Sequence, residues 1–492
     1  MSNIAKSALW VTVSEIIFNL SGFIIHSILG RVLGPADYGR YGIIITITTM
    51  VIILIGNGIP TAMAKYISEI FETNPRLILK IKKQAIIIQT ILIACITVIF
   101  YLSAPLISSL LKDESLTPLF RFSSLIIPAF AAASFYFSYY TGLHKFNIQA
   151  TLKTIRSILR IISVIGLALI FGLYGSIAGY IIAPFAVFTA AFLIDKFIID
   201  KKIKTQIAQV PKSEDLETNF DWKKLVNYGW QIVVFFLAYE LLISIDLYLV
   251  KGILNDDALT GIYNASLTVG RIPYYIFYAM TVFLLPMVSR KSASNKLTNA
   301  KEIVNNALHI MLVLLTPMVI LISIYSREIL ELLYGVKYLD GALPMSILVF
   351  GVGFLTIFYV LSFAANGGGK TMVSTSISFF GLILNIILNY FLILKMGIVG
   401  SAWATAITSF LITIVMLYYI KKHFNASLIS TEILKVGTSG IILYALAYYI
   451  PANIYTFIPL GITLFLIYLE IMYNLRAITK DDLLLFKKIL KK

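Results

Sequence analysis

The stretch GLYGSIAG, residues 172–179, returns in altered form as GIVGSAWA at residues 397–404, which lie 225 positions further along the chain. The same offset separates TGLHK at residues 141–145 from NGGGK at residues 366–370. Short glycine-containing stretches of this kind are typical of tight turns between helices. Their common spacing predicts that the chain contains an internal duplication.

A third match supports the duplication. GRYGIIITIT at residues 39–48 aligns with GIYNASLTVG at residues 261–270, at the slightly smaller offset of 222 positions. Internal repeats of this weak kind are typical of membrane transporters, whose substrate cavity lies between the two copies.

The composition predicts a membrane protein. Of the 492 residues, 59% are hydrophobic and 13% are charged, and the mean hydropathy is +0.89. A soluble domain has about 25% charged residues. Apolar runs of about 20 residues recur along the chain, and each is long enough to cross a bilayer as a helix. We therefore expect an all-α polytopic membrane protein, since a barrel would show short alternating strands.

About fourteen transmembrane helices are expected. The repeat unit holds six of them, and because six is even, both copies enter the membrane from the same side as parallel lobes. Two helices follow the second lobe. The expected spans are 8–30, 41–66, 85–104, 123–142, 157–173, 176–195, 228–250, 263–288, 303–325, 341–363, 373–393, 399–420, 436–451 and 454–473.

The spans divide the chain into four parts. Residues 1–199 form the first six-helix lobe, and residues 200–227 form a polar cytoplasmic linker. Residues 228–422 form the second lobe, and residues 423–492 hold the two additional helices and a basic cytoplasmic tail.

The distribution of lysine and arginine orients the protein. With the N-terminus inside, the inner segments hold 29 of the 40 basic residues, the outer loops hold 8, and three lie within spans. Basic residues concentrate on the cytoplasmic side of membrane proteins. Both termini are therefore expected to be cytoplasmic in a protein of the cell membrane. The net charge of +16 is explained by these loops and does not indicate nucleic acid as a partner.

The sequence favours neither an enzyme nor a nucleotide-driven pump. A phosphate-binding loop needs Gly-x4-Gly-Lys-Ser/Thr after a strand, whereas Ala364 stands at the first glycine position and a membrane helix precedes the run. The single cysteine, Cys95, allows no disulfide and no thiolate metal site. The inter-helical loops are too short for a catalytic domain, so no cofactor is expected.

Fourteen expected spans, the paired GxxGS turns and the stretch GRVLGPADYGRYG at residues 30–42 resemble the multidrug/oligosaccharidyl-lipid/polysaccharide (MOP) exporter superfamily. The polysaccharide transporter branch, the Wzx-type flippases, is the most similar. The resemblance implies an alternating-access flippase, expected to be a monomer, that moves an isoprenoid-(di)phosphate-linked oligosaccharide across the membrane. Its partners would be that substrate and membrane lipids, and no nucleotide.

Two related functions stay open. A peptidoglycan-precursor flippase usually carries a dense arginine cluster in its first two helices, where this chain has His26, Arg31 and Lys65. An exporter of small amphiphiles, coupled to H⁺ or Na⁺, would instead use an acidic site in the cavity. A membrane glycan polymerase, a third class, would need a large outer loop, which the expected spans do not leave.

Charged residues inside the spans, or on a helix that enters the membrane, are the candidate site residues, because a charge at mid-bilayer costs about 2.5–3.5 kcal/mol. Lys153, Arg156 and Arg160 follow the spacing i, i+3, i+7 and therefore lie on one helix face, where they can receive an anionic phosphate. The alternative is that they extend to the membrane surface and bind anionic lipid.

Further candidates lie on other spans. Arg271, Lys65 and His26 are expected to contact substrate, although Arg271 can also pair with an acidic residue of the preceding span. The candidates for coupling to H⁺ or Na⁺ are Glu15, Glu240 and Asp246. Each of them can equally be the counter-ion of a buried arginine.

Overall fold

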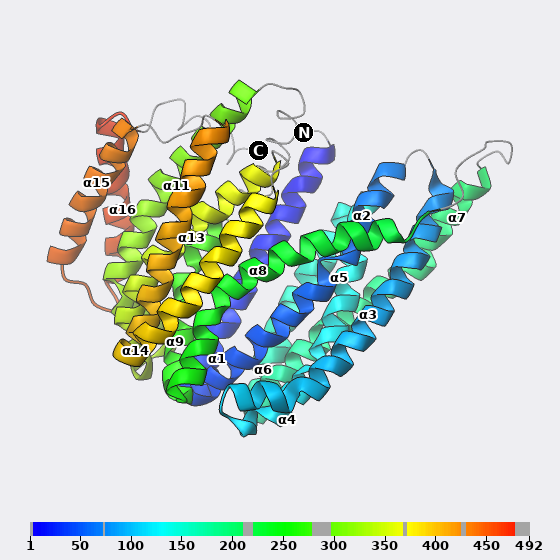
Figure 1. The fold of residues 1–492 in the computed structure, drawn as a ribbon, viewed down its shortest axis with the longest axis horizontal. Helices are drawn as coiled ribbons and strands as arrows, with labels where there is room; N and C mark the ends of the chain where they lie inside the picture. Colours follow the sequence, from blue (N-terminus) through cyan, green and yellow to red (C-terminus); the bar gives the residue numbers. More distant parts are fainter. Residues whose placement is uncertain are drawn as a thin grey trace. The chain divides into compact units, whose positions relative to one another are not determined.

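The computed structural model describes residues 3–71, 74–209, 220–277, 297–367, 371–424 and 430–477, and this part of the chain is helical and contains no strand (Figure 1). Helices satisfy every backbone hydrogen bond within one segment, which an apolar environment requires. The helices are α1 (Asn3–Gly56), α2 (Ile59–Ile70), α3 (Pro75–Leu110), η1 (Glu114–Leu116), α4 (Thr117–Ser123), α5 (Ile126–Gly142), α6 (Phe146–Ile194), η2 (Asp195–Ile199), α7 (Asp200–Gln209), α8 (Lys223–Leu254), α9 (Asp257–Gly270), α11 (Leu297–Ile324), α12 (Ser326–Tyr334), η3 (Val336–Gly341), α13 (Ala342–Gly367), α14 (Thr371–Phe424), α15 (Ser430–Tyr449) and α16 (Phe457–Asn474).

Nine helical segments within the described ranges are long and apolar enough to cross a membrane. Three of them contain a glycine with positive φ, at Gly34, Gly172 and Gly397, where the helix direction breaks. The all-helical, polytopic fold is thus confirmed. The number fourteen stays a prediction, because the expected span 263–288 extends beyond the described residues.

The chain forms two compact units, residues 2–244 and residues 245–492. In the first unit, a core lies among α2, α3, α5 and α6 and includes Met63, Ile78 and Tyr139. In the second, a core among α11, α15 and α16 includes Leu443 and Tyr468. The four-part division expected from the repeat places its boundaries elsewhere and remains a prediction.

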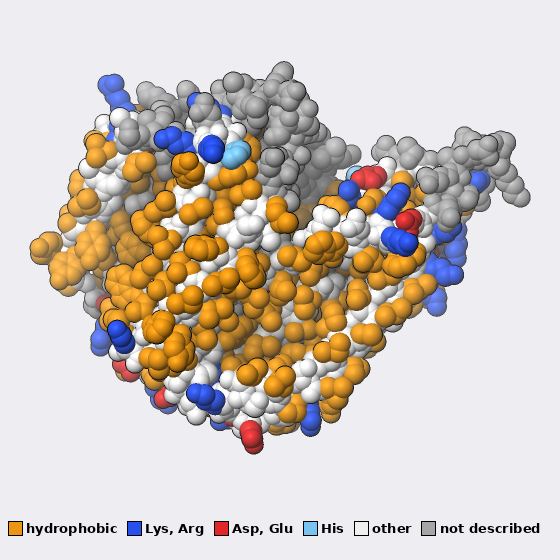
Figure 2. All heavy atoms as spheres, in the orientation of Figure 1, with side chains coloured by type: hydrophobic (Ala, Val, Ile, Leu, Met, Phe, Trp, Pro, Cys, Tyr) orange, Lys and Arg blue, Asp and Glu red, His pale blue; other side chains and the backbone are white. Residues whose placement is uncertain are grey.

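The outer surface is apolar, as a lipid environment demands. Figure 2 shows hydrophobic side chains covering most of the visible face, with lysine and arginine mainly along its edges. Many exposed side chains are large and apolar, among them Leu102, Phe171 and Phe391. Cys95 on α3 is exposed as well.

The two GxxGS turns have the same backbone geometry. Gly172 has φ 57° and ψ −133°, and Gly397 has φ 58° and ψ −137°. Three residues later, a Cβ on Gly175 would lie 1.9 Å from the carbonyl oxygen of Leu167. A Cβ on the equivalent Gly400 would lie 2.0 Å from that of Leu392, so both α6 and α14 fold back into hairpins so tight that only glycine fits.

Several helices begin before their expected spans. α6 begins at Phe146, eleven residues before the expected start at 157, so that Lys153 and Arg156 lie within it. α3 begins at Pro75 and includes Lys82, which the expected span 85–104 left in a loop. Of the NGGGK stretch, residues 368–370 lie outside the described residues.

Candidate functional site

Three cations of α6 surround one aromatic ring of α1, within the first unit. The Nζ of Lys153 lies 5.2 Å from the centre of the Phe18 ring, and the guanidinium carbons of Arg156 and Arg160 lie 5.0 Å and 4.3 Å from it. The three side chains therefore lie on one face of α6, as their spacing in the sequence predicts. Attraction between cations and the ring face contributes about 0.5–2 kcal/mol each. We refer to Lys153, Arg156 and Arg160 as the basic cluster.

Arg160 fastens α6 to α1. Its Nη2 donates to the carbonyl oxygen of Phe18 at 3.0 Å and to the hydroxyl of Ser21 at 2.6 Å. Both acceptors are neutral, and the side chain is only 5% exposed. The hydrogen bonds therefore hold the guanidinium in place without cancelling its charge.

Arg156 has unused hydrogen-bonding capacity. It is 3% exposed and stacks against Phe130 at 4.4 Å and Phe137 at 4.7 Å, in addition to Phe18. Its Nε and Nη1 are buried and have no hydrogen-bond partner among the described residues. Buried donors without a partner are rare in proteins and call for an explanation such as a ligand or a water molecule.

The basic cluster has one carboxylate beside it. Glu15 forms an ion pair with Lys153. Three cations facing one carboxylate leave two positive charges. Glu15 is therefore placed as the counter-ion of a basic residue, and its predicted role in ion coupling remains a prediction.

Aromatic residues connect His26 to the basic cluster. The Nδ1 of His26 lies 2.9 Å from the hydroxyl of Tyr38, and its ring packs edge-on against Tyr41. The Tyr41 hydroxyl donates to the hydroxyl of Tyr180 at 3.0 Å. The guanidinium carbon of Arg160 in turn lies 5.7 Å from the centre of the Tyr180 ring. His26 and Arg160, both predicted site residues, thus belong to one continuous group of contacts.

A second polar group lies inside the second unit, around Asp246. This carboxylate is 1% exposed, and its Oδ2 accepts from the hydroxyls of Tyr263 at 2.9 Å and Thr405 at 3.3 Å. Its Oδ1 accepts from the backbone N–H of Leu247. These N–H and O–H donors satisfy the buried carboxyl oxygens of Asp246, which would be costly to leave without hydrogen bonds.

Side chains of α14 continue this network. Asn385 donates to Thr405 at 3.5 Å, and Asn389 donates to the Oδ1 of Asn385 at 2.8 Å. Ser401 donates to Asn389 at 2.6 Å and lies 3.0 Å from the Tyr263 hydroxyl. We refer to Asp246, Tyr263, Asn385, Asn389, Ser401 and Thr405 as the Asp246 network.

The remaining predicted residues have other surroundings. Arg271 is the C-cap residue of α9, and its positive charge acts on Asp246. Its expected pairing with an acidic residue of the preceding span stays a prediction. Glu240 accepts a long hydrogen bond of 3.5 Å from Ser244. Lys65 lies over the ring of Tyr228 at 4.1 Å and 4.0 Å from Glu69.

The sequence did not reveal a buried cluster at α3. The Nζ of Lys82 donates to Asp195 at 2.5 Å and to Asp200 at 2.7 Å, and lies over the ring of Tyr139 at 4.7 Å. Asp195 begins the π-helical turn η2, and its Oδ1 is buried without a hydrogen-bond partner in the described part of the chain. The two aspartates follow Lys82 by 113 and 118 residues, so no local sequence pattern predicts these contacts.

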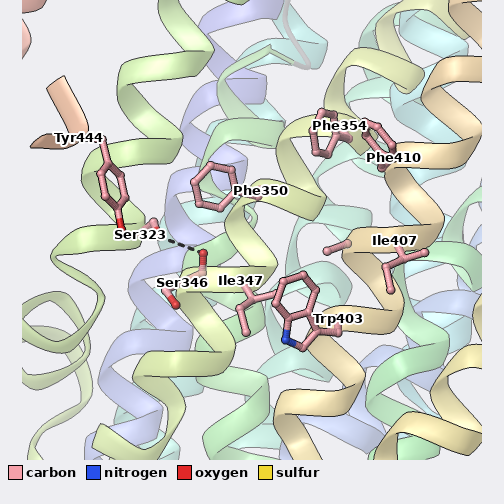
Figure 3. A pocket seen from close by; sticks show the side chains of 10 residues that line it. Ser323, Ser346, Ile347, Phe350, Phe354, Trp403, Ile407, Phe410 and Tyr444 are labelled. Atoms are coloured by element: carbon pink, nitrogen blue, oxygen red, sulfur yellow. Dashed lines mark hydrogen bonds between the residues drawn. The ribbon is translucent and has the colours of Figure 1, made fainter. Parts of the chain in front are cut away.

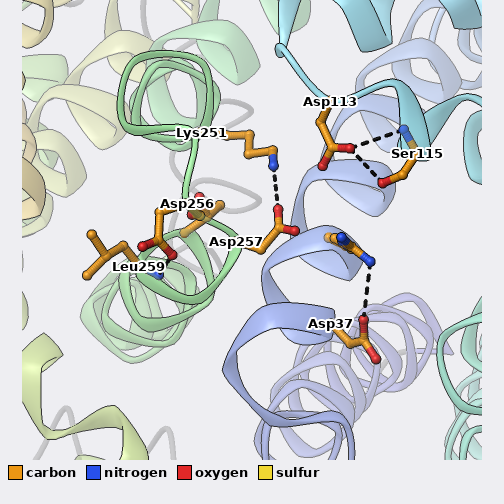
Figure 4. Close-up of polar contacts among 9 residues, drawn as sticks. Asp37, Asp113, Ser115, Lys251, Asp256, Asp257 and Leu259 are labelled. Atoms are coloured by element: carbon orange, nitrogen blue, oxygen red, sulfur yellow. Dashed lines mark hydrogen bonds and ion pairs between the residues drawn. The ribbon is translucent and has the colours of Figure 1, made fainter.

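A second ion pair between a lysine and an aspartate lies at the turn between α8 and α9. In Figure 4 the side chains of Lys251 and Asp257 point toward each other, and they form an ion pair. Asp256 caps α9 by accepting from the backbone N–H of Leu259. These contacts stabilise the turn that precedes Tyr263.

The second unit also has an apolar pocket of about 480 Å³ among α11, α13, α14 and α15 (Figure 3). Phe350, Trp403, Phe410 and Tyr444 line it, and Ser323 donates to the backbone oxygen of Ser346 at its wall. The described residues that line this pocket are uncharged, which suits a hydrocarbon chain and not a phosphate. Groups of three or more metal-binding His, Cys, Asp or Glu side chains are absent from the described ranges.

Comparison with known proteins decides the family. A family model described as "Polysaccharide biosynthesis protein" matches residues 4–292, more than half of the chain. The chain belongs to this family. A second model, MatE, matches residues 232–391. Membership of the MOP exporter superfamily is thereby confirmed, and the protein is a membrane transporter of the flippase type.

Three individual proteins illustrate what this chain is similar to. An uncharacterised membrane protein of Methanocaldococcus jannaschii is 25% identical over 86% of this chain and 99% of its own length. The probable low-salt glycan biosynthesis flippase Agl15 of Haloferax volcanii is 27% identical over 41% of this chain and 42% of its own. The solved structure of a lipid II flippase, MurJ, in an inward closed conformation, has a TM-score of 0.75 at 18% identity, covering 95% of this chain and 99% of that one.

Proposed function

We propose that this protein translocates an isoprenoid-(di)phosphate-linked oligosaccharide across the cytoplasmic membrane, with both termini in the cytoplasm, for polysaccharide or glycan assembly. The family match supports the substrate class, and the named glycan flippase among the relatives supports it further. The observation that carries the proposal is the basic cluster, in which buried guanidinium donors of Arg156 have no partner among the described residues.

The basic cluster suits a phosphate for three reasons. Its three cations exceed the single carboxylate of Glu15 by two positive charges. Guanidinium groups donate in a planar fork that matches phosphate oxygens. Burial strengthens the interaction, because little water competes with the anion. Arg156 and Arg160 would therefore bind the phosphate, Lys153 would add charge, and His26 would position Arg160 through the intervening tyrosines.

Coupling to a cation is proposed for Asp246. Its network combines one carboxylate with amide and hydroxyl oxygens, the ligand types that hard cations such as Na⁺ prefer. The same carboxylate can instead take up a proton. Glu15 and Glu240 remain weaker candidates, since Glu15 already pairs with Lys153. Lys65 and Arg271 are proposed to contact the substrate in other conformations of the cycle.

Flipping in proteoliposomes tests the phosphate site. The purified protein is reconstituted with a fluorescent isoprenoid-diphosphate oligosaccharide, and its movement between leaflets is measured by chemical quenching from outside. Arg156→Gln and Arg160→Gln should each slow flipping at least about tenfold, the equivalent of about 1.4 kcal/mol. Arg121→Gln is the matched control, because this exposed arginine also lies over an aromatic ring, that of Tyr101, at 5.3 Å.

Thermal unfolding in detergent must accompany that assay. If the folded Arg156→Gln and Arg160→Gln proteins flip the substrate as fast as the Arg121→Gln control, the basic cluster does not bind the substrate. A lipid carrying the peptidoglycan precursor serves as the competing substrate in the same assay.

A second candidate function is cation-coupled export of small amphiphiles. The MatE match over residues 232–391, which include Asp246, favours it. Under this function Asp246→Asn would abolish the export of a fluorescent cationic dye, whereas Arg156→Gln would not affect it. The two functions are therefore distinguished by which variant loses activity on which substrate.

A further inference from the structure

One side of α1 faces the basic cluster. Glu15, Phe18 and Ser21 follow one another at intervals of three residues, so consecutive members are neighbours on the surface of this helix. Glu15 pairs with Lys153, and Ser21 accepts from Arg160. Phe18 lies between these two contacts in the sequence of α1, and its ring contacts the whole basic cluster. Phe18 is therefore the residue whose side chain joins the three cations.

The contacts that hold Arg156 are aromatic. Its guanidinium carbon lies 4.4 Å, 4.7 Å and 5.0 Å from the ring centres of Phe130, Phe137 and Phe18. Its Nε and Nη1 are buried and have no hydrogen-bond partner within the described ranges. Contact with a ring uses the flat face of a guanidinium and leaves the N–H donors at its edge unoccupied. The rings therefore fix Arg156 in place and leave those donors available to an anion.

Arg160 is held by Phe18 in two ways. Its guanidinium carbon lies 4.3 Å from the centre of the ring, and its Nη2 donates to the backbone oxygen of the same residue at 3.0 Å. The Nε of Arg160 is also buried without a partner among the described residues. A change of side chain at position 18 removes the ring contact and keeps the bond to the backbone. The effect of the ring can therefore be tested separately.

The empty site has to hold three like charges together. Lys153, Arg156 and Arg160 repel one another, and burial makes each charge more costly. Glu15 compensates only one of the three charges. The negative face of an aromatic ring attracts cations although the ring itself is uncharged. The ring of Phe18 therefore stabilises the assembled cluster and leaves its excess positive charge unchanged, whereas a second carboxylate would cancel part of it.

We propose that Phe18 is the positioning residue of the phosphate site. Its ring holds the guanidinium groups of Arg156 and Arg160 in place before the anion arrives, and it leaves their edge donors and their charge for the phosphate. A site that is already ordered binds more tightly, because less freedom is lost on binding. This inference rests on the proposed binding of phosphate by the basic cluster.

Fluorination of the Phe18 ring tests the inference. Phenylalanine with one, two or three ring fluorines is introduced at position 18 of the full chain by nonsense suppression. Fluorine withdraws electron density from the ring face and weakens its attraction for cations stepwise, while the size of the ring changes little. Binding of farnesyl diphosphate to the purified protein in detergent is measured by isothermal titration calorimetry. The dissociation constant should rise with each fluorine, to about tenfold with three.

Two further variants of Phe18 separate the ring face from mere bulk. Phe18→Tyr keeps an aromatic face and should bind farnesyl diphosphate within about twofold of the unchanged protein, whereas Phe18→Leu should bind about tenfold more weakly. In the flipping assay, the substrate concentration that gives half the maximal rate should rise with each fluorine, and the maximal rate should stay the same. Loss of a merely structural contact would not follow the number of fluorines.

Phe197 provides the matched control. Its ring is 64% exposed and also has a cation beside it, since the Nζ of Lys196 lies 5.8 Å from its centre. Trifluorophenylalanine at position 197 should leave the affinity for farnesyl diphosphate unchanged. A cooperative thermal unfolding transition is required of every variant before its affinity is compared.

The outcomes separate the two proposals. If Arg156→Gln binds farnesyl diphosphate as tightly as the unchanged protein, the basic cluster is not a phosphate site, and both proposals are wrong. If the affinity depends on Arg156 but is equal for all fluorinated forms, the phosphate site stands and the inference about Phe18 is overturned. A dissociation constant that falls with fluorination would overturn it too, because the ring would then compete with the anion for the cations.

Discussion

Gly172 and Gly397, which occupy the same position in the two repeats, adopt the same backbone conformation, with φ of 57° and 58° and ψ of −133° and −137°. Side chains other than hydrogen rarely tolerate this region. Around each glycine, two halves of one long helix fold back on each other and bring the polar side chains of a site together. The duplication expected from the sequence therefore extends to the backbone geometry of the two turns.

Alanine at either turn should destabilise the protein. Gly172→Ala and Gly397→Ala place a Cβ at positive φ, which costs about 1–3 kcal/mol. The midpoint of thermal unfolding in detergent measures the loss. Gly166→Ala, in a helical part of α6 with open space around the glycine, is the control and should be neutral or slightly stabilising. Equal unfolding midpoints for all three variants would contradict the interpretation.

Alanine at Gly175 or Gly400 should destabilise the protein more than alanine at Gly172 or Gly397. A Cβ there meets a backbone oxygen at 1.9 Å or 2.0 Å, so the hairpin must open. We expect Gly175→Ala and Gly400→Ala to reduce the yield of monodisperse protein in size-exclusion chromatography far more than Gly461→Ala, whose surroundings in α16 are open. A normal elution profile for both hairpin variants would show that the helices separate without cost.

Loss of Lys82 should be strongly destabilising. Lys82→Met leaves Asp195 and Asp200 without their cation, and removing one partner of a buried ion pair costs about 3–5 kcal/mol. Adding Asp195→Asn to that variant should recover part of the loss, because the unpaired buried charge is then gone. Thermal unfolding of the single and double variants gives the coupling. Additive losses would mean that Lys82 and Asp195 do not interact in solution.

Tyr41 and Tyr180 should be energetically coupled. Tyr41→Phe and Tyr180→Phe each remove the hydrogen bond between their hydroxyls, worth about 0.5–1.5 kcal/mol. Because both remove the same bond, the double variant should lose less than the two single losses together. Chemical denaturation or thermal unfolding measures all three. If the two single losses of stability add up to the loss in the double variant, the two hydroxyls do not stabilise the protein through a bond to each other.

Membrane potential should drive the proposed reaction. An outward-moving anion gains about 2.3 kcal/mol per charge for each 100 mV of inside-negative potential. A potassium gradient with valinomycin can make the interior of the proteoliposomes negative. Movement of a diphosphate-linked substrate from the inner to the outer leaflet should then accelerate. Reversing the gradient should slow it. A rate independent of potential would mean that the charge moves together with a compensating cation.

Much of the architecture could be predicted from hydrophobicity and glycine patterns alone. The helical membrane fold and the turns at Gly172 and Gly397 follow from local sequence, because apolar runs and positive-φ glycines act within a few residues. The three cations of the basic cluster were predicted to share a face for the same reason: helical periodicity is local.

The acidic residues that pair with the buried lysines could not be predicted. Lys82 bonds to Asp195, 113 residues away, and Lys153 pairs with Glu15, 138 residues away. These contacts form only when non-neighbouring helices pack. The same partners explain why α3 and α6 begin earlier than hydrophobicity suggests, since a paired lysine is far less costly inside the membrane than an isolated one.

The hairpins at Gly172 and Gly397 also bear on the order of folding. Leu167 and Gly175 meet although they are close neighbours in the sequence, as do Leu392 and Gly400. Contacts of such low sequence separation require little loop-closure entropy. We therefore expect the two hairpins to be early, independent folding nuclei, each able to form as soon as its own stretch of chain has left the ribosome.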